Sequence, residues 1–130
     1  MKKVLSMIAA GALATSAFAA QVNVLDKVMD GPGSVTWTKN NQYFLGNFVF
    51  VDSLQTLVIE AGTVIKGLPG SIGFTGGAAG NLSALIVRRG GKIVAQGTKK
   101  EPIIFTSLVD NLNDDCDIGP SARGLWGGMV

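Results

Sequence analysis

Histidine is absent from this 130-residue chain, and cysteine occurs once. Without histidine, neither a Ser-His-Asp triad nor a histidine-based metal site can form within the chain. The single cysteine, Cys116, excludes an internal disulfide. It is either a free thiol in a loop or pairs with a cysteine on another chain or on sequence beyond this one. No long apolar run follows the first residues, so we expect no membrane span in the mature chain.

The first 19 residues have the layout of a secretory signal peptide. Lys2 and Lys3 form a basic start, residues 4–14 are apolar, and residues 17–19 form a small-x-small cleavage motif. A retained helical anchor is the alternative. We therefore expect the protein to be exported and to be secreted, periplasmic or located on the outer cell surface. We expect helix only in the signal peptide. Removal of the two lysines leaves nine basic against nine acidic residues, which argues against a nucleic-acid partner.

One pattern of two short strands occurs twice, in residues 57–67 and again 28 residues later in 85–97. Glycine-broken strands at such a period are typical of a stacked coil. Because alternate strand residues point to opposite faces, one interior is expected to hold Leu57, Ile59, Ile65, Leu85, Val87, Ile93 and Ala95. This prediction places Leu57 directly beneath Leu85, and Glu60 beneath Arg88 on the outside.

The remaining segments predict an all-β chain. Short strands are expected over 21–25 and 35–38, and two more within 43–51, broken at Gly46. We interpret residues 20–55 as an aromatic-rich cap and residues 56–130 as about two coils that continue beyond the chain end. Residues 103–107 form a third side with Ile103 and Phe105 inward, and residues 124–130 begin the next turn. The glycine-rich residues 68–83 are a loop.

The segments 37–43, 56–67, 84–93, 102–107 and 124–128 resemble, in that order, the opening part of large secreted bacterial proteins with a right-handed parallel β-helix, the pectate-lyase-like solenoid. The resemblance covers residues 35–130. It implies that further coils follow this segment and that they belong to the same protein. The same solenoid also occurs in polysaccharide lyases and hydrolases, so the fold alone does not select a chemistry. Val58 departs from the pattern, because relatives often place a threonine there.

Two clusters have chemical character. Oxygen ligands crowd into one loop, as Ca²⁺ requires, and the candidate ligands are Asp110, Asn113, Asp115 and Asp117. The spacing departs from the EF-hand loop, since Gly119 falls one position late and no glutamate closes the site; a solvated loop is the alternative. Arg88, Arg89 and Lys92 could present cations to an acidic polysaccharide, or Arg88 could simply pair with Glu60 across neighbouring strands. Trp126 is either a sugar-stacking platform or a buried strand aromatic.

These patterns favour a secreted or cell-surface scaffold or adhesion-type protein without catalysis in this segment, with cell-surface glycans as partners and no cofactor other than calcium. The alternative is the N-terminal part of a polysaccharide lyase or glycoside hydrolase. Since stacked coils normally need at least three repeats, we expect the isolated chain to be marginally stable or to self-associate.

Overall fold

A computed structural model describes residues 19–69, 82–122 and 124–130. Within these ranges the regular structure is entirely β, in short strands. The strands are β1 (Ala20–Val24), β2 (Gly33–Trp37), β3 (Asn41–Leu45), β4 (Phe48–Val51), β5 (Gln55–Ile59), β6 (Val64–Gly67), β7 (Ala84–Val87), β8 (Lys92–Ala95) and β9 (Ile104–Ser107). The signal-peptide prediction, with its helix, falls almost wholly outside the described residues, as does most of the glycine-rich loop.

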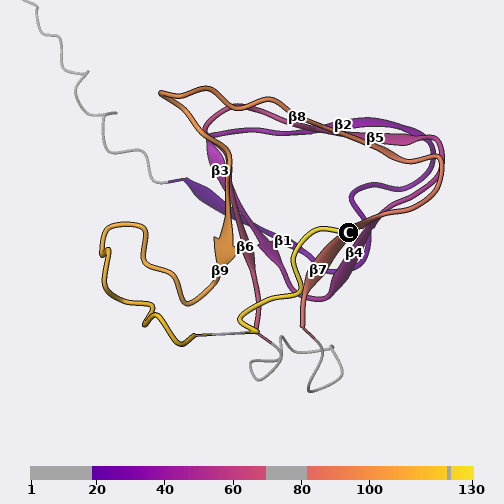
Figure 1. Ribbon diagram of the computed structural model, residues 1–130. Coiled ribbons are helices and arrows are strands. Elements are labelled where there is room, and N and C mark those ends of the chain that lie inside the picture. Colours follow the sequence, from indigo (N-terminus) through magenta and orange to yellow (C-terminus); the bar gives the residue numbers. More distant parts are fainter. Residues whose placement is uncertain (1–18, 70–81, 123) are drawn as a thin grey trace, which may run out of the picture.

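The strands stack as three parallel sheets that form the three sides of a coil (Figure 1). A four-stranded sheet has the order β1-β3-β6-β9, a two-stranded sheet pairs β4 with β7, and a three-stranded sheet has the order β2-β5-β8. Isolated parallel bridges from Lys27 to Phe50 and from Leu85 to Met129 extend the two-stranded side in both directions. The described chain therefore makes three complete turns and two sides of a fourth, rather than about two coils. The prediction of a parallel β-helix is confirmed.

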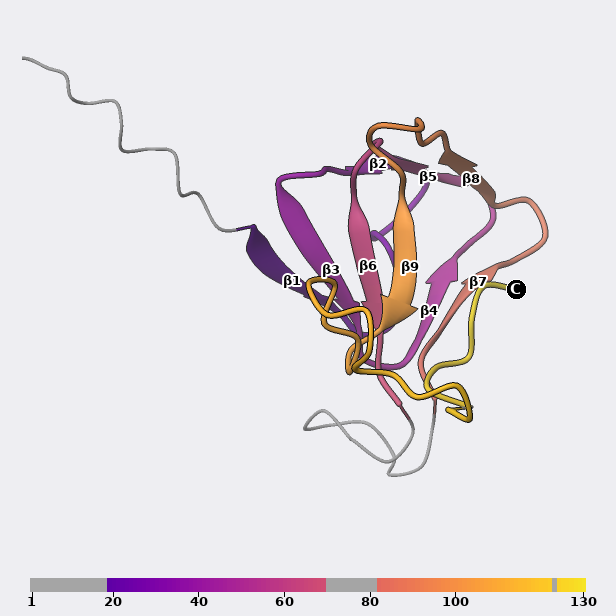
Figure 2. The same cartoon turned by 60° about the vertical axis from the view of Figure 1, so that its left-hand side comes forward.

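Residues 20–55, interpreted as a cap, contribute strands to the coil itself. β1 pairs in parallel with β3, and β2 pairs in parallel with β5. Figure 2 shows β1, β3, β6 and β9 side by side in one continuous sheet. The aromatic side chains of this segment lie within the first and second turns, where Trp37 and Tyr43 are almost completely buried.

The interior is filled by alternate residues of each strand, as the period of two requires. Leu57, Ile65 and Leu85 have no exposed surface, and Ile59 has almost none. Burying each such side chain contributes about 1.5–3 kcal/mol. Val87, Ile93, Ile103 and Phe105 pack against this core while partly exposed. Ala95 is in register with the buried Ile59, on the inward face as predicted, but it is exposed at the end of the edge strand β8.

The predicted stacking of Leu57 beneath Leu85 is wrong. Leu57 lies between Val35 and Ile93 in the three-stranded sheet. Leu85 pairs with Val49 in the two-stranded sheet. Both leucines face the same hydrophobic core, but from different sides of the coil. The paired strand residues are 21 or 22 positions apart in the earlier turns and 36 or 40 apart where residues 68–83 intervene, so no constant period describes this coil.

The corner turns explain the misleading 28-residue repeat. After β5 the chain turns through Gly62, with φ +85°, and after β7 it turns through Gly90, with φ +88°. A left-handed residue of this kind favours glycine. The same glycine turn is thus used at two different corners of the coil. Each of these turns follows a strand with alternating apolar residues, so the two segments have similar sequences. Leu54, with φ 66°, takes the corresponding place after β4.

Candidate functional surfaces

Two long insertions leave the coil at one corner, where the four-stranded sheet gives way to the two-stranded sheet. Residues 68–83 connect β6 to β7, and residues 108–124 connect β9 to the segment whose Met129 bridges to Leu85. The first insertion is closed at its base by Ser83, whose hydroxyl accepts from the Leu68 amide at 2.6 Å. The second is closed by Ser107, whose hydroxyl donates to the Leu125 carbonyl at 3.2 Å. We call this corner the insertion corner; in Figure 2 residues 108–124 lie below β9.

The carboxylates of the second insertion accept hydrogen bonds from the coil and from the loop itself. Thr106 donates its hydroxyl proton to Asp110, and the Asn111 amide donates to Asp117. The ammonium of Lys66, on the outer face of β6, donates to the carbonyl oxygen of Asp110 at 2.7 Å. This loop is therefore fastened to the four-stranded sheet at its first residues.

Among the predicted calcium ligands, the structure does not gather three carboxylates around one point. In the described part of the chain, no group of three or more Asp, Glu or Cys side chains is arranged to hold a metal ion. Asn113, Asp115 and Asp117 are exposed, whereas Asp110 is half-buried. Calcium binding by this loop stays a prediction.

The predicted glycan-binding cations lie at a second corner, between the two-stranded and three-stranded sheets. Arg88 donates through Nη1 to Asp52 Oδ1 at 2.8 Å. Its guanidinium carbon lies 3.9 Å from the centre of the Phe50 ring, a cation–π contact between successive turns. Arg89 and Lys92 are exposed beside it. We call this the cationic corner, and it brings together the three residues that the sequence predicted.

The predicted partner of Arg88 is wrong, because Glu60 lies at the third corner of the coil. There the Lys39 amide donates to Glu60 Oε2 at 2.9 Å, and Lys39 Nζ donates to Glu101 Oε1 at 2.9 Å. This bond and the negative charge of Glu101 raise the pKa of Lys39. Each side chain of the ion pair is about half exposed, and such pairs contribute about 0–1 kcal/mol. The contacts nevertheless join three successive turns at one edge.

Trp126 lies half-buried over the backbone of the preceding turn. Its ring stacks on Phe105 with centroids 6.5 Å apart and planes 1° apart. A Cβ on Gly67 would come within 2.5 Å of the indole, so glycine is needed where Trp126 packs. Of the two interpretations of Trp126, the packed aromatic agrees better with this geometry, although Trp126 lies outside any regular strand.

Sequence reasoning overlooked Gln55, a buried polar residue that joins the first two turns. Its Nε2 donates to the carbonyl oxygens of Met29 and Gly31 at 3.1 and 2.8 Å, and its Oε1 accepts from the Asp52 amide at 2.9 Å. The signal was available, because Gln55 occupies an inward position two residues before Leu57.

A comparison with protein-family models agrees with this architecture. The model described as "Pectate-lyase like beta helix domain" matches residues 28–130, which run from the first turn to the last residue of the chain. The chain belongs to this family. Comparisons of this β-helix chain with curated proteins and with solved structures gave no match. Across the described residues of the β-helix, no helix has the length and apolar character that crossing a membrane requires.

Proposed function

We propose that this β-helix chain is an exported, non-catalytic scaffold that binds acidic polysaccharide through its cationic corner. The observation that carries the proposal is the fixed position of Arg88. Its ion pair with Asp52 and its contact with Phe50 hold one cation in place. Arg89 and Lys92 lie exposed next to it, and their side chains have no hydrogen-bonded partner among the described residues. An extended polyanion could contact such a surface without any enclosed site.

The same contacts support a scaffold rather than a catalyst. A base needs a free, positioned side chain within reach of the substrate proton. The side chain of Arg88 is instead engaged by a carboxylate and by an aromatic ring. Lys39 and Lys66 also donate hydrogen bonds to neighbouring turns or to the acidic loop. Export is supported by the basic start, apolar run and small-residue motif of residues 1–19. Identification of the N-terminal residue of the exported protein tests it directly; Ala20 is expected.

Binding of the full chain to immobilised polygalacturonate tests the proposed function. The variant Arg89→Gln/Lys92→Gln is expected to weaken binding at low salt, and added salt should weaken binding by the unsubstituted chain. The matched control is Lys99→Gln/Lys100→Gln, which removes the same charge from exposed residues away from the cationic corner. Equal losses in both variants would show that only net charge matters and would contradict a specific surface.

Catalysis is tested with the same polymer in the presence of calcium. A polysaccharide lyase releases unsaturated products that absorb ultraviolet light, and a hydrolase releases new reducing ends. We expect neither product from this chain. Release of either product, lost on substitution of Arg88, would replace the scaffold proposal with the alternative of a lyase or hydrolase.

A further inference from the structure

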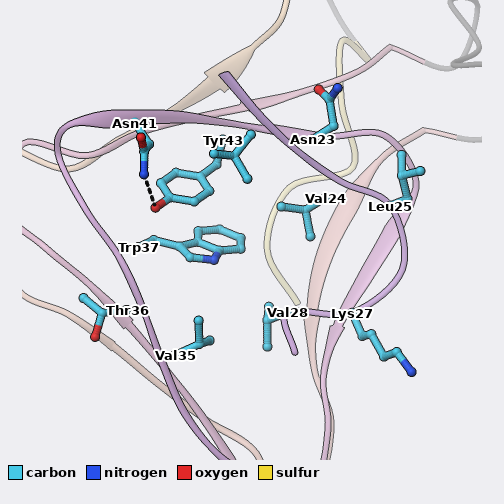
Figure 3. A pocket seen from close by; sticks show the side chains of 11 residues that line it. Asn23, Val24, Leu25, Lys27, Val28, Val35, Thr36, Trp37, Asn41 and Tyr43 are labelled. Carbon is cyan, nitrogen blue, oxygen red and sulfur yellow. Dashed lines mark hydrogen bonds between the residues drawn. The ribbon is translucent and has the colours of Figure 1, made fainter. Parts of the chain in front are cut away.

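The first turn of the coil borders an open hollow of about 390 Å³. Residues of β1, β2 and β3 and of the segment between β1 and β2 line it, so it lies at the end of the coil where the described chain begins (Figure 3). Small-molecule sites in proteins typically have volumes of about 300–1,000 Å³. The hollow falls at the lower end of this range.

Most of the residues that line the hollow are apolar or aromatic, although polar atoms contribute the larger share of its exposed surface. Val22, Val24, Val28 and Val35 line it, and each is partly buried against the hydrophobic core. Trp37 and Tyr43 form an aromatic wall, with ring centroids 4.6 Å apart and planes inclined by 12°. Figure 3 shows the indole of Trp37 with Tyr43 on one side and Val28 and Val35 on the other.

The aromatic wall is fixed in place by hydrogen bonds to the hydroxyl of Tyr43. Tyr43 Oη accepts from the Thr38 amide at 2.9 Å and from Asn41 Nδ2 at 3.3 Å. Only 3% of Trp37 and 4% of Tyr43 is exposed. The two rings therefore form a rigid surface, and ligand binding would not carry the entropic cost of ordering them.

The indole nitrogen of Trp37 supplies a hydrogen-bond donor at this site. No hydrogen bond joins it to another described residue, whereas buried tryptophan usually finds a partner for its N–H group. Every fully enclosed side-chain nitrogen or oxygen of the described residues has a partner. The unbonded indole nitrogen must therefore retain contact with solvent, and Figure 3 shows it on the side of the ring where Val28 and Val35 lie.

Charge at the hollow favours a neutral occupant. The polar lining residues Asn23, Thr36 and Asn41 are uncharged. The single charged lining residue, Lys27, pairs with Asp30 at 2.7 Å, and this pairing raises the pKa of the ammonium. The lysine charge is thus already compensated at the rim.

We propose that this hollow binds a small, neutral, largely apolar molecule that accepts one hydrogen bond from the indole N–H of Trp37. Contact with the valine side chains would remove part of the apolar surface of the ligand from water, and each square ångström removed contributes about 25 cal/mol. The single donor would orient the acceptor of the ligand. This site is separate from the cationic corner and does not depend on the function proposed there.

Titration of the full chain with Nile red tests this proposal. Nile red is neutral and apolar, carries a carbonyl acceptor, and fluoresces strongly when shielded from water. The chain contains two tryptophans, so the variant Trp126→Phe leaves Trp37 as the only tryptophan. We expect saturable binding in this variant, with quenching of Trp37 emission by energy transfer to the bound dye.

Two further variants locate the dye. Val28→Phe fills the hollow and is expected to lower affinity at least about tenfold, whereas Val94→Phe makes the same change on the exposed face of β8 and should leave affinity unchanged. Trp37→Phe keeps an aromatic ring but removes the donor, and we expect affinity to fall about three- to tenfold. Thermal melts identify any variant that fails to fold, and Val28→Phe gives an independent result if Trp37→Phe does not fold.

Three results would overturn the proposal. The first is absence of saturable binding by the chain. The second is binding that Val28→Phe and Val94→Phe weaken equally, which would place the dye elsewhere. The third is affinity that falls as protein concentration rises, because the hollow would then be covered by another copy of the chain.

Discussion

The buried amide of Gln55 offers a direct test of how the first turn of the coil is held to the second. The variant Gln55→Leu keeps a similar side-chain volume but removes one acceptor and both donors. It leaves the carbonyl oxygens of Met29 and Gly31 and the amide of Asp52 without their partner. These three groups lie at one corner, so the substitution acts on the contact between the first and second turns.

The expected cost follows from the three bonds. Each intramolecular hydrogen bond contributes about 0.5–1.5 kcal/mol, which gives about 1.5–4.5 kcal/mol in total. Gln55 is only 4% exposed, but the bonds themselves are part-buried, so water can replace some of them in the variant. We therefore expect the lower half of the range, about 1.5–3 kcal/mol of lost unfolding free energy.

Urea denaturation followed by circular dichroism measures this loss. Gln21→Leu is the matched control, because Gln21 is exposed on β1 and its side chain makes no hydrogen bond within the described chain. The control should change the free energy of unfolding by less than about 0.5 kcal/mol. If Gln55→Leu is no more destabilising than Gln21→Leu, the buried amide does not fasten the first turn and the argument fails.

Three further outcomes are expected. Gly67→Ala should displace the indole of Trp126 and red-shift its fluorescence, because the new Cβ would overlap the ring. The free energy of unfolding should fall by about 1–3 kcal/mol. An unchanged emission spectrum and an unchanged melting temperature would contradict the packing. Leu54→Gly should raise the free energy of unfolding by up to about 1 kcal/mol, since it relieves a left-handed leucine at an exposed corner, and a lower melting temperature would refute this. The hydrogen bond from Lys27 and its positive charge lower the pKa of Asp30. The ionised pair therefore stabilises the fold above the unfolded-state pKa of this aspartate, and this stabilisation is lost as the pH falls through the lowered folded-state pKa. NMR titration of Asp30 should show this lower pKa, and Lys27→Ala should restore the ordinary one.

Much of the fold could be predicted from alternation and turn chemistry. The strands around Leu57, Ile65 and Leu85 lie where their apolar period of two places them, and their side chains are buried as expected. Element ends shifted by a residue or two, as for β9, which begins at Ile104 rather than Ile103. Local patterns fix which face of a strand is apolar, and that information is contained within a few residues.

Register between turns could not be predicted in the same way. Leu57 and Leu85 occupy similar local sequences, yet they lie on different sides of the coil. The pairing depends on how many residues lie between successive strands, and residues 68–83 separate β6 from β7. A sequence period measures spacing along the chain, whereas stacking depends on spacing after the insertions are removed.

The candidate surfaces were predicted unevenly for a related reason. Arg88, Arg89 and Lys92 are close in sequence, so their shared corner could be expected. The partners of Arg88 come from the preceding turn, 36 residues away in the case of Asp52. Trp37 and Tyr43 were recognised as aromatic, but nothing local showed that they would form one wall of a hollow.

The common exit point of the two insertions has a consequence for how such a protein can change. A segment that departs and returns at the insertion corner leaves the rungs above and below in their positions, because Ser83 and Ser107 close each base against the adjoining backbone. Evolution or an engineer can therefore lengthen, shorten or exchange these excursions independently. The coil can serve as a fixed frame on which one edge is free to diversify.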